Sequence, residues 1–250
     1  MTETEFNTCT DPRSMLDFLR GRASHRKLRL FAVACCRRIW HLLIHPVSRK
    51  AVEVAERFAD RAVTVEERRK THDAAEEVGC CLADSYWSKP LDPNNEFDNL
   101  VLAAGVHLGA ISGAAAAATA AVADVTGEAS ILTAWNYAWE AAAWSNVSPD
   151  GDYEDAQDGH AERTAQAALL RELFGPLPFR AVRSDASWLT PAVVALANSI
   201  YEERRWGDLR ILGDALQEAG CSDAEVLEHC RGKGPHTKGC WVCDLLLKKE

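Results

Sequence analysis

The C-terminal part of the chain concentrates side chains that can bind a metal ion or act as nucleophiles. From His229 to Cys243 it holds three cysteines and two histidines. Thiolate sulfur and imidazole nitrogen are the donors that zinc prefers, and a structural zinc ion takes four ligands in a tetrahedron. Four of these residues are separated by five, three and two positions. The segment therefore predicts a zinc site with the candidate ligands Cys230, His236, Cys240 and Cys243.

This spacing matches none of the common zinc-finger patterns, so the ligand set has alternatives. The glycines between the candidates let the backbone fold around an ion, and folding can bring in a fourth ligand from elsewhere. We keep four residues as alternates: His229, Cys221, Cys35 and Cys36.

Two other interpretations fit the same segment. Cys240-Trp-Val-Cys243 has the C-x-x-C spacing of thiol–disulfide exchange, and it lies at a predicted helix start, where the helix dipole lowers a thiol pKa. The strand and helix that surround this motif in thioredoxin-like proteins are not predicted here. In the third interpretation the cysteines and the Trp241 ring are buried, and the tail closes a helical bundle by packing alone.

The elements that must position these residues are helices. Apolar side chains recur every three or four positions over most of the chain, as from Leu28 to Leu42. Capping signals open three further helices at Thr64-Val-Glu-Glu67, Thr190-Pro191 and Ser222-Asp-Ala-Glu225. No series of strands is predicted. We therefore expect an all-α fold, an irregular multi-helix bundle with a short helical C-terminal module.

Composition divides the chain into three regions. Residues 1–145 form an N-terminal helical region with Ala- and Trp-rich helices, one of them predicted over Glu128–Trp144. Residues 146–186 contain an acidic loop, a helix that stops at Gly175-Pro176, and a Pro-rich linker. Residues 187–250 form the C-terminal helical module with the Cys/His tail.

Charge and composition exclude several classes of partner. The net charge of −9 disfavours general nucleic-acid binding, which needs a basic surface. Met1–Asp11 is polar and acidic, unlike a secretory signal, so the nine cysteines predict a cytoplasmic protein with reduced thiols. Asn99–Ala123 has no charged residue over 25 positions, but its Ala and Gly are weakly apolar and no basic cluster flanks it. We expect a core helix there rather than a membrane span.

Both ends of the chain resemble a large bacterial paralogous family. The resemblance rests on the runs Arg26-Lys27-Leu28-Arg29-Leu30-Phe31, Cys35-Cys36-Arg37-Arg38-Ile39-Trp40, His229-Cys230-Arg231 and Gly239-Cys240-Trp241-Val242. It implies membership in a family without an established activity. In relatives of this kind the position of Cys243 is usually aliphatic. The resemblance therefore implies that a family-wide function does not depend on the Cys240/Cys243 pair.

The sequence does not favour an enzyme. It contains neither a Gly-rich phosphate loop nor the G-x-S-x-G turn that presents a nucleophilic serine. We expect a non-enzymatic protein-interaction or regulatory helical module, with another protein as its partner. The alternative is a zinc-stabilised or thiol-redox regulator centred on the C-terminal Cys/His cluster.

Overall fold

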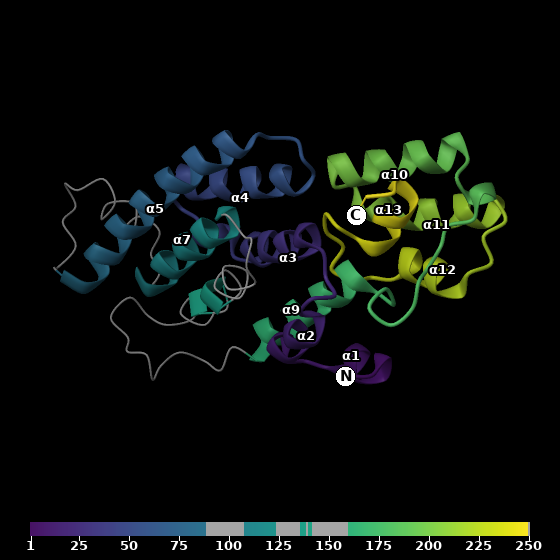
Figure 1. Cartoon of the computed structure of the whole chain (residues 1–250), viewed down its shortest axis with the longest axis horizontal. Helices are drawn as coiled ribbons and strands as arrows, with labels where there is room; N and C mark the ends of the chain where they lie inside the picture. Colours follow the sequence, from purple (N-terminus) through teal and green to yellow (C-terminus); the bar gives the residue numbers. More distant parts are fainter. Residues whose placement is uncertain (89–107, 124–135, 139, 142–159, 250) are drawn as a thin grey trace. The chain divides into compact units, whose positions relative to one another are not determined.

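The computed structural model describes residues 1–88, 108–123, 136–138, 140–141 and 160–249 (Figure 1). All regular elements in this part of the chain are helices, which confirms the all-α prediction. The chain divides into two compact units, and each is described by itself. We call Met1–Lys27 together with Ala165–Glu250 the end unit, and Leu28–Thr164 the middle unit.

Several predictions concern residues outside the described part. They are the acidic loop that starts at residue 146, most of the helix predicted over Glu128–Trp144, and the first part of Asn99–Ala123. The second part of that uncharged run is α7 (Leu108–Val122). Among the described helices, none combines the length and the apolar character that a membrane crossing needs.

The middle unit contains α4 (Pro46–Ala59), α5 (Val65–Ser88), α7 and most of α3 (His25–Arg38), with a short 3-10 turn η1 (Trp40–Leu42). Local capping begins its helices. The ring of His45 accepts a hydrogen bond from the Val47 amide at the start of α4, and the Thr64 hydroxyl accepts one from the Glu67 amide at the start of α5. The second contact agrees with the helix start predicted at Thr64.

Small side chains let α7 pack closely in the middle unit. Its residues Ala114, Ala117 and Ala118 are fully buried. The hydroxyl of Thr119 donates a hydrogen bond to the carbonyl of Ala75 on α5, at 3.1 Å. Alanine supplies helix propensity without bulk, so a helix of this composition suits a buried position between larger neighbours.

The end unit begins with α1 (Glu3–Thr8) and α2 (Pro12–Leu19) and contains most of α9 (His160–Phe174). It continues with η3 (Ala186–Trp188), α10 (Pro191–Glu203), η4 (Trp206–Asp208), α11 (Leu209–Glu218), α12 (Ala224–Arg231) and α13 (Trp241–Leu247). Thr190 caps α10, as predicted, by accepting from the Val193 amide. The cap of α12 is Asp223, one residue after the predicted Ser222, because its carboxylate accepts from two amides.

Aromatic side chains join the two ends of the chain inside the end unit. The ring of Phe179 lies 5.6 Å from that of Phe6 and 5.1 Å from that of Phe18, and Arg171 donates a hydrogen bond to the carbonyl of Cys9. In Figure 1, α1 and α2 accordingly lie beside α9. The two units therefore divide the chain differently from the predicted regions 1–145, 146–186 and 187–250, because residues 1–27 share a core with residues far along the chain.

The C-terminal helices α10 to α13 enclose a hydrophobic core of the end unit. Tyr201 on α10 is fully buried in it, with the leucines of α11. Four cysteines belong to the same core, and each is at most 3% exposed: Cys221, Cys230, Cys240 and Cys243. This core fixes the position of the segment between α12 and α13, which carries two of the predicted metal ligands, His236 and Cys240.

Candidate metal centre

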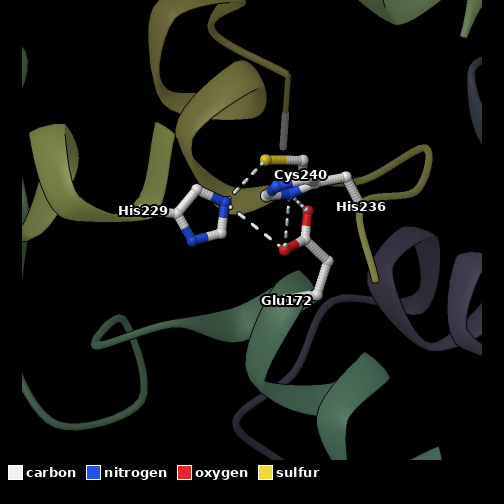
Figure 2. A group of neighbouring side chains, drawn as sticks. All are labelled: Glu172, His229, His236 and Cys240. Atoms are coloured by element: carbon white, nitrogen blue, oxygen red, sulfur yellow. Dashed lines mark hydrogen bonds and ion pairs between the residues drawn. The ribbon is translucent and has the colours of Figure 1, made fainter. Parts of the chain in front are cut away.

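Four potential ligands converge inside the end unit. They are Glu172 on α9, His229 on α12, His236 in the following loop, and Cys240, which immediately precedes α13. One ligand atom from each lies within 4.8 Å of every other. Figure 2 shows the four side chains pointing toward a common centre. A buried Glu/His/His/Cys group of this kind could hold a metal ion.

The distances fit a compact coordination site. His229 Nε2 lies 3.1 Å from the sulfur of Cys240 and 3.4 Å from a carboxylate oxygen of Glu172. His236 Nδ1 lies 3.2 Å from both oxygens of that carboxylate. Ligand atoms around a tetrahedral zinc ion are about 3.3 to 3.7 Å apart, given zinc bonds of about 2.0 to 2.3 Å. The measured separations are close to this range before any ion is placed.

The contacts of His236 place either a proton or a metal ion between its ring and Glu172. Its Nε2 lies 3.4 Å from the carbonyl of Gly232, which can only accept a hydrogen bond, so a proton on Nε2 would have a partner there. In the neutral ring Nδ1 would then be a bare lone pair directed at a carboxylate. Two acceptors in contact repel each other, so either a proton or a metal ion must lie between them.

Opposing contacts act on His229. Burial disfavours its charged ring, but Cys240 and Glu172 raise its pKa to about 9, whereas the side chain of Trp241 favours the neutral ring. Its indole N–H, which can only donate, lies 2.9 Å from His229 Nδ1. In the neutral ring the proton is then on Nε2, facing Cys240 and Glu172. A metal ion on Nε2 would displace that proton and leave Nδ1 to carry one, so the indole N–H would have to turn away. Metal loading should therefore change the environment of Trp241.

Burial and ion pairing act against each other on the charged groups. Burial opposes ionisation of Glu172, but hydrogen bonds from His229 and His236 outweigh it and lower the pKa of the carboxyl to about 2. Burial likewise opposes the charge on His236, but Cys240 and Glu172 raise its pKa to about 10. Burial raises the pKa of the Cys240 thiol well above its usual value. Without a metal, the centre therefore holds a Glu172 carboxylate, a His236 imidazolium and a neutral thiol.

These pKa shifts predict that rising pH lowers the stability of the metal-free protein and raises the metal affinity of the same centre. The lowered pKa of Glu172 stabilises the fold above its ordinary 4.5, and the effect is lost as pH falls through 2. The raised pKa of His236 stabilises it below 6.5, and the effect is lost as pH rises through 10. Metal must displace the His236 proton, so metal affinity rises about tenfold per pH unit for each proton released.

Thermal melts of chelated and zinc-loaded protein between pH 5 and 9 would measure the pH dependence of stability in the two states. The chelated protein should lose stability above pH 6.5, and the gap between the two melting temperatures should widen as pH rises. A gap that does not change with pH would contradict the assignment of His236 as a ligand.

A glycine lets Trp241 reach its position beside the centre. Gly175, directly after α9, has a left-handed backbone with φ +48°, and a Cβ there would lie 2.7 Å from three atoms of the Trp241 indole. Any larger residue would therefore strain the backbone and push the ring away from His229.

We expect Gly175→Ala to destabilise the chain by about 2 kcal/mol more than Gly220→Ala, because overpacking adds about 1–3 kcal/mol. Gly220 is the matched control, since it also has a left-handed backbone (φ +90°) but open space where the Cβ would go. Urea unfolding of both variants measures the difference. Equal losses would show that the indole contact is unimportant.

A buried lysine connects the two backbone segments that carry Glu172 and Cys240. The Lys27 ammonium donates to the carbonyl of Leu173 at 2.8 Å and to that of Gly239 at 2.6 Å. It also pairs with Asp244 at 2.6 Å, and Asp244 receives two hydrogen bonds from Arg26. Leu173 and Gly239 are the chain neighbours of Glu172 and Cys240, so Lys27 holds these two ligands at a fixed separation.

The group brought together by the fold differs from the predicted ligand set. It contains His236 and Cys240 from that set and the alternate His229. Cys230 and Cys243 are not in the group. Cys230 faces the core, because a Cβ added to Gly213 of α11 would lie only 3.0 Å from the Cβ of Cys230. The side chain of Cys243 is fully buried. Both contribute to hydrophobic packing, where a thiol behaves as a small apolar side chain.

The remaining alternates lie elsewhere. Cys221 is buried at the turn before α12, outside the group. Cys35 and Cys36 are buried on α3 in the middle unit, and burial raises the pKa of Cys36 to about 12. None of the three belongs to the ligand group found among the described residues.

Glu172 is not among the ligands predicted from the sequence. The residue lies on the inward face of α9, four positions after Ala168 and three after Leu169, so its carboxylate interrupts an apolar stripe. An acidic side chain at a core position must be paired or bound to a cation, because burying an isolated charge is costly. That pattern is the signal that could have identified it.

Comparison with known proteins gives no match to a family model, a curated protein or a solved structure. The chemistry of the centre therefore rests on its own geometry, and the family resemblance of the two ends stays a prediction.

Proposed function

We propose that this chain is a non-enzymatic helical regulatory or protein-interaction module whose end unit is stabilised by one structural zinc ion. The observation that carries the proposal is the position of Glu172. The residue is 4% exposed, and its carboxylate faces two imidazoles and a thiol that come from a segment more than fifty residues away. An ion at this point would link α9 to the C-terminal helices.

The donor types favour zinc over other common ions. One sulfur, two imidazole nitrogens and one carboxylate oxygen suit a borderline-soft tetrahedral ion, whereas Mg²⁺ and Ca²⁺ prefer oxygen donors alone. Four protein ligands would leave no open position for a substrate or an activated water, which is typical of structural zinc. This supports a structural role for the ion rather than catalysis.

Metal analysis of the purified full-length chain tests the proposal. We expect about one zinc ion per chain, removal by a strong chelator, a lower melting temperature after removal, and recovery when zinc is returned. Protein that contains no zinc and whose melting temperature does not respond to added zinc or chelator would refute it.

The regulatory role assumes a cytoplasmic location and a protein partner. Zinc would set the shape of the surface that the partner contacts, because it fixes the segment between α12 and α13. Binding of the partner should then be lost after chelation and regained with zinc. Affinity capture from the native cell with loaded and chelated protein compares the two states.

A thiol-redox regulator has weaker support. Cys240 and Cys243 keep the C-x-x-C spacing, but both side chains are fully buried, and burial raises the pKa of Cys240. A reactive thiol needs an accessible thiolate. Thiol titration with identification of the modified residues distinguishes the two functions: Cys240 or Cys243 reacting faster than the exposed Cys80 in the chelated, folded protein would favour redox regulation.

A further inference from the structure

A cavity lined in part by Trp241 lies in the end unit, and none of the four candidate metal ligands lines it. Its volume is about 480 Å³. Its apolar walls come from six residues of four segments: Leu19, Phe174, Leu177, Pro178, Trp241 and Leu245. This volume and an apolar lining are typical of sites that bind small organic molecules.

The charged residues around the cavity are mostly cationic. Arg22, Lys27, Lys248 and Lys249 line it, against the single carboxylate of Asp244. That carboxylate is already satisfied, because Arg26 donates to both of its oxygens and Lys27 lies 2.6 Å from one of them. Asp244 therefore does not neutralise the other cations of the cavity.

Two of the cations have no acidic partner in the described part of the chain. The guanidinium of Arg22 lies over the ring of Phe18, 4.5 Å from its centroid, and forms no ion pair there. The ammonium of Lys248 likewise has none. Both residues are exposed, so their charges lie at the rim of the cavity, while its walls are apolar.

We propose that this cavity binds a small organic anion, a carboxylate carried on a flat apolar body. The apolar body would lie against Trp241, Phe174 and Leu245, where its surface is removed from water. The carboxylate would stay at the rim, where the fork of Arg22 donates two hydrogen bonds and Lys248 adds a second charge. The proposal does not depend on zinc, since every residue named here can be tested in the chelated protein.

Titration of the full-length chain with 2-naphthoate tests the site, and 2-naphthamide serves as the neutral probe of the same shape. We expect saturable binding of the carboxylate, at least about tenfold tighter than that of the amide. Arg22→Gln and Lys248→Gln should each weaken naphthoate binding several-fold, whereas Lys233→Gln, an exposed lysine away from the cavity, should not. Ala23→Trp, which places a ring in the cavity, should abolish binding.

The indole N–H resonance of Trp241, assigned with Trp241→Phe, locates the bound probe. It should shift on titration with naphthoate in zinc-loaded and in chelated protein alike. Three results would each overturn the proposal: equal affinity for the amide, unchanged binding in both charge variants, or no saturable binding. Any of them would show that the cavity holds only water. Circular dichroism and melting temperatures confirm that each variant is folded.

Discussion

Cys240→Ala should release the metal from the purified chain, whereas Cys230→Ala and Cys243→Ala should keep about one zinc ion each. All three residues are fully buried cysteines of the same core, so the three substitutions remove the same atom from similar surroundings. Only the sulfur of Cys240 lies within ligand distance of His229, His236 and Glu172. Metal content measured by elemental analysis therefore separates the ligand set of the fold from the set predicted by spacing.

Loss of the ion should also lower the stability of the chain. A ligand present at a thousand times its Kd stabilises the folded state by about 4 kcal/mol. Cys240→Ala should therefore lower the free energy of unfolding by about this amount. Cys230→Ala and Cys243→Ala should lose only the packing of one sulfur, about 1 kcal/mol. Zinc lost from Cys230→Ala and Cys243→Ala as well as from Cys240→Ala would favour the spacing-based set, and zinc retained by Cys240→Ala would contradict both sets.

Glu172→Gln provides an independent check on the same centre. It keeps the shape of the side chain and removes the charge that His236 faces, so it should abolish zinc retention. Glu162→Gln is the control, because it also removes a carboxylate from an ion pair, with Arg38 in the middle unit. The control should keep its zinc. Equal metal loss in both variants would indicate general destabilisation rather than a ligand role.

Lys27→Met should destabilise the chain by about 3–5 kcal/mol, the usual cost of removing one partner of a buried ion pair. The change leaves the carbonyls of Leu173 and Gly239 without their donor and removes one of the cations that neutralise Asp244. Because these carbonyls adjoin Glu172 and Cys240, zinc affinity should fall as well, although Lys27 does not lie in the ligand group.

Lys238→Met is the matched control for Lys27. Its ammonium pairs with Glu202, a half-exposed carboxylate, at 3.1 Å. Because the Glu202 carboxylate remains solvated when the lysine is removed, the control should lose much less stability than Lys27→Met. Urea unfolding and competition for zinc with a chelating dye measure stability and affinity separately. A Lys27→Met chain as stable as the control would show that Lys27 does not hold the two segments.

Helix ends that are set by neighbouring residues could be predicted from the sequence. The stop of α9 before Gly175 and the cap of α10 at Thr190 were predicted correctly, because a left-handed glycine and a capping hydroxyl act within a few positions. The cap of α12 was misplaced by one residue, since Ser222 and Asp223 both have the side chain of a cap and only the fold selects between them.

The ligands of the metal centre could be predicted only in part from neighbouring residues. The C-terminal segment alone indicated ligands in the right place, and His236 and Cys240 lie in the group found. Its fourth member, Glu172, lies 64 residues before His236 in the chain. No spacing rule connects residues so far apart, because their approach depends on how α9 packs against the C-terminal helices.

By itself, the sequence determined the helical class, several helix ends and a concentration of thiols and imidazoles near the C-terminus. These follow from side-chain periodicity and capping, which act over one or two helical turns. Only the tertiary structure decided which cysteines face the core and which sulfur meets Glu172, and that Lys27 holds the two segments together. Those outcomes depend on long-range packing, in which the direction of a side chain is fixed by helices distant in the sequence.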